Sequence, residues 1–230
     1  MAKLHSLCKS FHPDDYHHLG DELARVGHAR NMFSGCHNFD HQHRAWEYSI
    51  CLAAAGSRAD LVGKKCLDVG GSYAILSGLL VWSGADVTVT DCSDHSAQQM
   101  EMGRRAIEGP GATPGGRMRF VQGDFANGLP GKTFDLVTCV SVIEHTGDDE
   151  AVFQELLKAV APGGTLVLTT DFHPSGTAQL TAHCRCYNGP MLEKWGRSPG
   201  FEPVGSFIYF DHGAHVFGYN FAALALRRKP

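Results

Sequence analysis

At 230 residues, 43% of them hydrophobic, the chain is long enough for one domain with a buried core, which excludes a wholly disordered protein. Its net charge of −4, with no basic run longer than Arg227-Arg228-Lys229, argues against a dedicated nucleic-acid binder or a polybasic membrane binder. No apolar stretch approaches the roughly 20 residues that span a bilayer, and residues 1–15 lack the apolar segment of a signal peptide, so we expect a cytoplasmic protein without membrane contact.

Residues 1–56 are predicted to form an N-terminal helical lid. The first forty residues are polar and rich in histidine, with a short helix expected over residues 14–30. Over residues 41–55 apolar side chains, among them Trp46, Ile50 and Leu52, recur at helical spacing until Gly56 ends the run. Residues 57–230 are expected to form the core domain.

Strands and helices alternate through the middle of the chain. Strands are predicted at residues 65–69, 86–90, 118–122, 134–140 and 165–170, and helices at residues 72–82, 94–107 and 148–160. Apolar strands that alternate with helices predict a parallel sheet with helices on both faces.

The pattern changes after residue 170. A helix is expected near residues 190–195, and apolar runs at 207–210 and 216–226 flank Asp211-His212-Gly213, which is a hairpin signal. The predicted fold is therefore α/β, a Rossmann-like seven-stranded sheet that is mostly parallel and finishes with a C-terminal antiparallel hairpin. The long apolar hairpin also offers a surface for a homodimer.

Polar residues follow the ends of the predicted strands, which is where ligands bind in an open parallel sheet. The first strand leads into Gly70-Gly71-Ser72, in which the glycines permit a tight turn and Ser72 caps the next helix. The N–H groups of that helix favour a carboxylate, and Asp68 is placed to accept from an ammonium group. Asp91 ends the second strand, where a carboxylate accepts from ribose hydroxyls, and Asp124-Phe125 follows the third with a carboxylate and an aromatic face.

Five segments resemble the class I methyltransferases that use S-adenosylmethionine (SAM), particularly the branch grouped as type 11. They are LDVGGSYAIL, VTVTDCS, VQGDF, FDLVTCVSVIEH and LKAVAPGGTLVLTT, which stand in the family's order and at its separations over residues 66–170. The resemblance implies a seven-stranded methyltransferase fold and a bound SAM.

The same resemblance assigns the cofactor site. It implies that Asp68, Gly70 and Gly71 line the methionine part of SAM, that Asp91 holds the ribose, and that Asp124 and Phe125 meet the adenine. We add Ser72, Cys92 and Ser141 to this site, because they directly follow or lie within the same strand-end segments. The family's first loop usually reads Asp-x-Gly-x-Gly-x-Gly, whereas Ser72 and Ala74 stand at its later glycines here, so the loop geometry or the affinity can differ.

The acceptor side is less determined. His145 follows the fourth strand and is the leading candidate for a general base, since a hydroxyl acceptor must lose its proton as it reacts. A Glu-His pair recurs at this position in the resembling family, and the alternative is a structural role. By resemblance, Trp46 or Tyr48 lies near the ligand on a helix over the crevice; alternatively, both only anchor that helix to the sheet.

The 14 histidines raise the question of a metal. His37, His41 and His43 are the first candidates as ligands, but their spacing does not place all three on one helix face, and we assign no metal. Arg185 suits either an acidic group on the acceptor or a surface contact. The scattered cysteines, eight in all, are expected to be reduced thiols.

The sequence thus predicts a SAM-dependent methyltransferase that acts on a small molecule, with oxygen ranked first as the acceptor atom, then nitrogen, then carbon. No nucleic-acid partner is expected. One alternative is a non-catalytic SAM-fold binding or scaffold protein, and a second is a metal-assisted O-methyltransferase. A nicotinamide-dinucleotide enzyme is disfavoured, because the first loop lacks Gly-x-Gly-x-x-Gly.

Overall fold

The computed structural model describes residues 6–32, 42–71, 75–93, 98, 101, 115–129, 131–176, 179–181, 184–210 and 218–230. Within these residues no helix is long and apolar enough to cross a membrane.

The described residues form one large sheet of eight strands in the order β1-β10-β6-β5-β2-β3-β4, with β9 paired to β10. The parallel part comprises β2 (Lys65–Val69), β3 (Asp86–Asp91), β4 (Arg117–Gln122), β5 (Phe134–Val140) and β6 (Val160–Phe172). The antiparallel part comprises β10 (Asn220–Arg228), β9 (Phe201–Pro203) and β1 (Lys9–Ser10). A separate pair joins β7 (Gln179–Thr181) to β8 (Cys184–Arg185).

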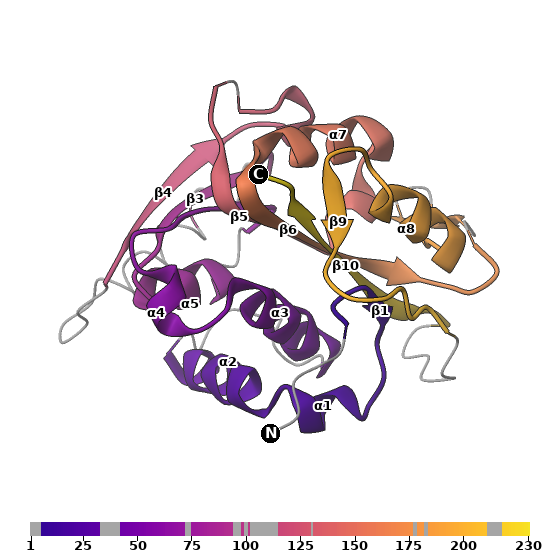
Figure 1. Cartoon of the computed structure of the whole chain (residues 1–230), viewed down its shortest axis with the longest axis horizontal. Helices are drawn as coiled ribbons and strands as arrows, with labels where there is room; N and C mark the ends of the chain where they lie inside the picture. The colour runs from indigo at the N-terminus through magenta and orange to yellow at the C-terminus, as the bar shows by residue number, and fades with distance from the viewer. Residues whose placement is uncertain are drawn as a thin grey trace.

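The helices flank this sheet. They are α1 (Asp15–His18), α2 (Gly20–Met32), α3 (Gln42–Ala55), α4 (Arg58–Leu61), α5 (Ile75–Trp82), α7 (Asp149–Ala159) and α8 (Gly189–Gly196), with 3-10 turns η2 (Phe125–Asn127) and η3 (Ile143–His145). Figure 1 shows α2 to α5 on one face of the sheet and α7 and α8 on the other. The helix predicted at 94–107 lies mostly outside the described residues.

Two hydrophobic cores result, one on each face of the sheet. Because successive side chains of a strand point to opposite faces, Cys66 and Val87 pack beneath α2, α3 and α5, while Leu67 and Val69 pack with α7 and α8. Every one of these four side chains is at most 3% exposed. The predicted mostly parallel α/β sheet, covered by helices on both faces, is therefore confirmed.

The antiparallel strands at the C-terminus are confirmed, but their partners differ from the predicted hairpin. β10 pairs with β6 along one edge, and β1 and β9 share its other edge. Residues 207–210 form no strand, although Ile208 makes a single bridge to Lys9, and residues 211–217 lie outside the described part. The reason is tertiary: β1, which comes from the chain's beginning, occupies the edge position that a hairpin would need. The division into residues 1–56 and 57–230 stays a prediction.

Candidate functional site

A cavity of about 240 Å³ opens at the carboxyl ends of β2 and β5. In the sheet, β3 and β4 lie on one side of β2, and β5 and β6 lie on its other side. The cavity is therefore at the point where the strand order reverses. Its lining is drawn from α3, the β2–α5 turn, α5 and the β5–η3 turn: Arg44, Tyr48, Asp68, Val69, Gly70, Gly71, Ile75, Leu76, Val140, Ser141, Val142 and His145.

The turn after β2 requires both glycines. Gly70 has φ +71°, a conformation that side chains disfavour, and its N–H donates to the carbonyl of Thr90 at 2.7 Å. A Cβ on Gly70 would overlap Val142, and one on Gly71 would overlap the carboxylate of Asp68. The two glycines therefore let the backbone pass close to these side chains at the floor of the cavity.

Asp68 is buried beneath that turn, with 3% of its surface exposed. Ser77 Oγ donates to its Oδ2 at 2.5 Å, and Thr138 Oγ1 donates to its Oδ1 at 2.8 Å. Burial raises the pKa of Asp68 to about 6 despite these two hydrogen bonds. Asp68 thus ties β2 to both α5 and β5, and each of its oxygens already accepts one hydroxyl proton.

Glu47, on α3, is a site residue that the sequence analysis did not find. It is fully buried, and its Oε1 accepts from Ser141 Oγ at 2.5 Å and from Thr169 Oγ1 at 2.6 Å. Arg44 lies one helical turn earlier and forms an ion pair with Glu47 Oε2 at 3.0 Å, without the alignment of a hydrogen bond. The available signal was the spacing: Arg44 and Glu47 are three residues apart and share a helix face.

These contacts hold the end of β5 in an unusual conformation. Ser141 has φ 49° and is the sole non-glycine residue with positive φ within the described part of the chain. Its N–H donates to the carbonyl of Thr169 at 3.1 Å, and its hydroxyl reaches Glu47. Glu47 therefore braces α3 against β5 and β6 at the point where the cavity opens.

Two further buried carboxyls, Glu144 and Asp171, lie beside this brace. Burial, followed by the charge of Asp171, raises the pKa of Glu144 well above its ordinary value, and burial raises the pKa of Asp171 to about 6. Thr170 Oγ1 donates to Glu144 Oε2 at 3.2 Å, and Cys184 Sγ donates to Asp171 Oδ2 at 3.0 Å. Within the described residues, Glu144 Oε1 is buried without a hydrogen-bond partner.

Arg44 carries the compensating positive charge of this group. Burial by itself lowers the pKa of Arg44, but the charges of Glu47, Glu144 and Asp171 outweigh that effect and raise it. Its guanidinium therefore stays protonated although its side chain is only 20% exposed. His145 lies at the exposed side of the same group and lines the cavity.

The structure separates the predicted cofactor residues into two sets. Tyr48, Asp68, Gly70, Gly71 and Ser141 line the cavity together with His145. Five other predicted residues are not among the described residues that line the cavity: Trp46, Asp91, Cys92, Asp124 and Phe125. Ser72 is outside the part of the chain that the structure describes.

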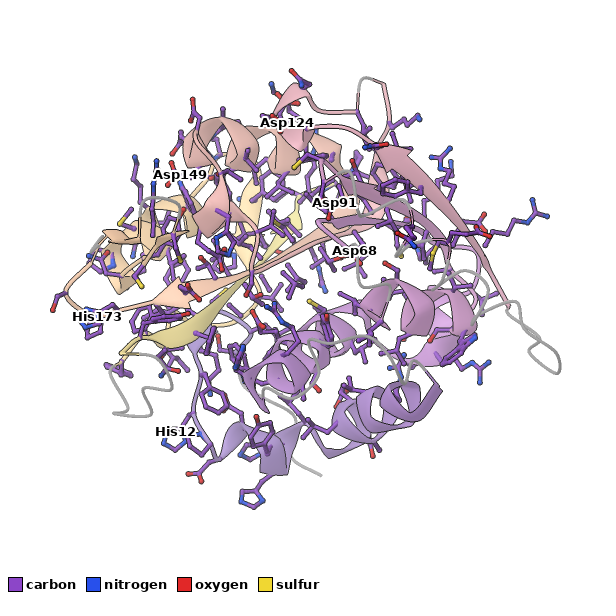
Figure 2. The ribbon with its side chains drawn as sticks, turned by 180° about the vertical axis from the view of Figure 1, so that it is seen from behind. His12, Asp68, Asp91, Asp124, Asp149 and His173 are labelled. Carbon is purple, nitrogen blue, oxygen red and sulfur yellow. The ribbon has the colours of Figure 1, made fainter. Side chains whose placement is uncertain are left out.

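Asp91 is nevertheless the last residue of β3, and Asp124 follows the end of the neighbouring β4; Figure 2 labels both together with Asp68. Asp91 Oδ1 accepts from the N–H of Ser93 at 2.8 Å, and Asp124 Oδ1 accepts from the N–H of Ala126 at 2.9 Å as it caps η2. Phe125 is 7% exposed and packs in the α7 core, whereas Cys92 is exposed. Of these, Asp91 and Asp124 present carboxylates along the edge that continues from the cavity.

Trp46 and Tyr48 point to different surroundings. Trp46 packs edge-on against Phe11, with 5.5 Å between ring centroids, and donates from Nε1 to Asp15 Oδ2 at 2.9 Å. Asp15 also forms an ion pair with Lys9 of β1. Trp46 therefore anchors α3 to the N-terminal segment, while Tyr48 lines the cavity.

The histidines of the metal hypothesis fall into two groups. His37 and His41 lie outside the described residues, and His43 is buried with its ring stacked on Phe221 at 4.0 Å between centroids. The part of the chain that the structure describes holds no cluster of three or more His, Cys, Asp or Glu side chains arranged for a metal. All seven cysteines in that part are free thiols.

Arg185 makes a surface contact. Its guanidinium lies 3.1 Å from Asp149 Oδ2 and donates to the carbonyl of Gly147 at 3.2 Å. Tyr187 Oη donates to the same Asp149 oxygen at 2.9 Å. Arg185 therefore fastens the start of α7, and it is not among the described residues that line the cavity.

Comparison with known proteins supports the fold and the domain. Residues 67–168 match the family described as a methyltransferase domain. The mitochondrial ubiquinone biosynthesis O-methyltransferase of Schizosaccharomyces pombe is 34% identical over 108 residues, which are 47% of this chain and 38% of that protein. The matched region therefore spans less than half of that relative.

Two solved structures share the fold over nearly the whole chain. The 1,6-didemethyltoxoflavin-N1-methyltransferase of Burkholderia thailandensis, with bound S-adenosylhomocysteine, superposes with a TM-score of 0.60 at 17% identity and covers 96% of this chain and 92% of its own. The cyclase SpnF superposes with a TM-score of 0.60 at 17% identity and covers 92% and 95%. At these identities the likeness shows the fold alone, and the second structure indicates that the fold also hosts other reactions.

Proposed function

We propose that this chain, whose residues 67–168 form a methyltransferase domain within the class I methyltransferase fold, transfers a methyl group from SAM to a small molecule. The observation that carries the proposal is the cavity at the ends of β2 and β5, where a glycine turn, a buried carboxyl and a cationic side chain converge. The activity named for the matching Schizosaccharomyces pombe relative, an O-methyltransferase, favours oxygen as the acceptor atom, ahead of nitrogen and carbon.

The described residues fit SAM as the methyl donor. The floor of the cavity is bare backbone at Gly70 and Gly71, and side chains there would collide with the protein itself. Arg44 is the one Lys or Arg among the described lining residues, so it is the group that pairs with the carboxylate of the donor. Asp91 and Asp124 continue along the same sheet edge and accept from ribose and adenine, respectively.

When bound, SAM supplies a methyl group that its sulfonium already activates, so the protein has to align the acceptor rather than to activate the donor. Tyr48 and Val142 close the apolar side of the cavity and exclude water. A hydroxyl acceptor gives its proton to an imidazole nitrogen of His145, at the exposed side of the cavity. Asp171 lies within electrostatic reach of His145.

The competing function is a non-catalytic binding protein in the same fold, as the variety of reactions in this fold allows. Calorimetric titration of the full chain with SAM and with S-adenosylhomocysteine, followed by methyl transfer from labelled SAM to a panel of small phenols, alcohols and amines, separates the two. Binding with transfer supports the enzyme, and binding without transfer to any acceptor supports the alternative. No binding at high micromolar concentration rejects the enzyme and leaves a scaffold protein that does not use the cofactor.

Three finer features stay part of the proposal. The metal-assisted variant predicts that a chelator abolishes transfer, and activity that survives the chelator removes it. A cytoplasmic location and a homodimer remain predictions, to be checked by fractionation of the native host and by the mass of the particle in solution.

A further inference from the structure

A groove of about 590 Å³ lies at the end of the sheet opposite to the cavity described above. It is lined by the beginnings of β2, β3 and β4 and by the loop that leads into β5: Lys65, Asp86, Val87, Thr88, Arg117, Met118, Arg119, Gly131, Lys132, Thr133 and Phe134. Lys65 is the first residue of β2, whereas Gly70 follows its last residue, so the strand's length separates the two sites.

The groove exists because one half of a sheet face lacks a helix among the described residues. Met118 and Val87 point to the α5 core, so Arg117, Arg119 and Thr88 point to the opposite face, where α7 packs on β5 and β6. Figure 1 shows β4 at the sheet's edge, with α4 and α5 on the other side. Among the described residues, this half face is therefore left to the side chains that line the groove.

The groove concentrates positive charge, because four cationic side chains and one carboxylate, that of Asp86, line it among the described residues. Lys65, Arg117, Arg119 and Lys132 line it, and within the described residues none of the four forms an ion pair with a carboxylate. The exposed Asp86 is the single acidic residue among the described lining residues. Other cations are paired in the same structure, as Lys64 with Asp135, Lys158 with Glu155, Arg185 with Asp149 and Arg197 with Glu193. The whole chain has a net charge of −4, so a group of four cations without ion-pair partners among the described residues differs from its average charge.

Arg117 and Arg119 lie on the same face of β4. Arg119 Nε donates to Thr88 Oγ1 at 2.7 Å, which fixes its guanidinium and leaves its two terminal amino groups available. Arg117 lies two residues earlier on the same face, about 7 Å away along the strand. Lys65 stands in the register row of Arg117, two strands distant or about 10 Å, with Asp86 between them in that row. Guanidinium groups bind phosphate oxygens in pairs, and this spacing suits more than one phosphate.

We propose that this groove binds a small molecule that carries two or more phosphate groups, at a site separate from the methyl-transfer cavity. The volume lies within the roughly 300–1,000 Å³ typical of small-ligand sites. A nucleic acid needs a basic stripe far longer than four residues, and the net negative charge of the chain opposes its approach. The phosphates meet Arg117 and Arg119, and Lys65 and Lys132 supply charge at the sides.

Titration calorimetry of the full chain with inorganic tripolyphosphate, at low salt and without divalent metal, tests the site. We expect saturable binding that Arg119→Gln weakens by about tenfold or more, and that Arg119→Lys restores only in part because the planar guanidinium is lost. Arg197→Gln is the matched control, because Arg197 is also exposed and its partner Glu193 lies on α8. Its affinity for tripolyphosphate should equal that of the unaltered chain.

Two outcomes overturn the proposal. One is no binding of tripolyphosphate, whether or not a 20-nucleotide RNA binds through Arg119, and the other is an equal loss in Arg119→Gln and Arg197→Gln. Amide chemical shifts that move on β3 and β4 during the titration support the location, and shifts confined to the carboxyl ends of β2 and β5 contradict it. Arg119 is exposed, so the variant keeps its fold, and an unchanged circular dichroism spectrum verifies this.

Discussion

The two ends of the parallel strands differ in the sign, the burial and the pairing of their charged side chains. At the carboxyl end, Glu47, Glu144 and Asp171 are at most 4% exposed and are held by hydroxyls, a thiol and Arg44. At the amino end, Lys65, Arg117, Arg119 and Lys132 are exposed and lack carboxylate partners in the described part of the chain. Buried charges must be paired or neutralised, whereas exposed ones are stabilised by water and salt. We therefore expect mutations of these charges to destabilise the fold at the carboxyl end more than at the amino end.

The largest effect is expected at Glu47. Glu47→Ala leaves the partly buried Arg44 without its partner and removes the acceptor of Ser141 and Thr169, so the free energy of unfolding should fall by about 3–5 kcal/mol. Urea denaturation measures the change. Glu155→Ala, which removes an exposed ion pair with Lys158, is the control and should cost less than about 1 kcal/mol. Equal losses of unfolding free energy in the two variants would contradict the claim that the buried ion pair contributes more to stability than the exposed one.

The next effect is a dependence of stability on pH. The pKa of Asp171 is raised in the folded state to about 6, so its contribution is fully present below its unfolded pKa and is lost as pH rises through about 6. Asp171→Asn should therefore gain stability relative to the unaltered chain between pH 4 and pH 7, by up to about 3 kcal/mol. The neighbouring groups Glu47, Glu144, Arg44 and His145 stay in place in this variant. Thermal unfolding at a series of pH values gives the difference, and a constant difference would contradict the raised pKa.

A variant at His145 tests whether this exposed side chain, next to the buried carboxyls, acts as the general base. If it accepts the acceptor's proton, His145→Ala should lower turnover at least about a hundredfold while S-adenosylhomocysteine still binds with its original affinity. Single-turnover methyl transfer and calorimetry measure the two quantities. A loss of only a few fold would assign His145 to the shape of the loop instead.

Asp91 extends the comparison along the carboxyl edge. Because a carboxylate on the ribose makes charge-assisted hydrogen bonds, Asp91→Ala should weaken SAM binding by about tenfold or more. Asp86→Ala is a matched control, since Asp86 begins the same strand at the opposite end and should leave SAM affinity unchanged. An unaltered dissociation constant in Asp91→Ala would contradict the placement of the ribose.

The smallest effect on stability is expected in the groove at the amino end. Arg117→Gln alters an exposed side chain without a carboxylate partner among the described residues, so the free energy of unfolding should change by no more than about 0.5 kcal/mol. A rise in stability is also compatible, because the change reduces repulsion among the four cations. A loss of more than about 2 kcal/mol by urea denaturation would show that the groove is structural.

The sequence by itself determined the mostly parallel sheet and the line of polar residues at the ends of its strands. These features follow from local patterns, since alternation of apolar runs with helical spacing predicts each element, and parallel strands bring Asp68, Asp91 and Asp124 to one edge. The fold and the glycine turn could be predicted for that reason.

Only the tertiary structure decided which side chains share a space. Glu47 meets Ser141 and Thr169 across 94 and 122 residues of sequence, and β1 closes the edge of β10 although its two residues carry no strand pattern. The basic groove likewise joins Lys65, Arg117 and Lys132 only when the strands align. Burial and pairing of charge depend on such long-range contacts, and no local pattern records them, so the chemistry at both ends of the sheet had to be read from the folded chain.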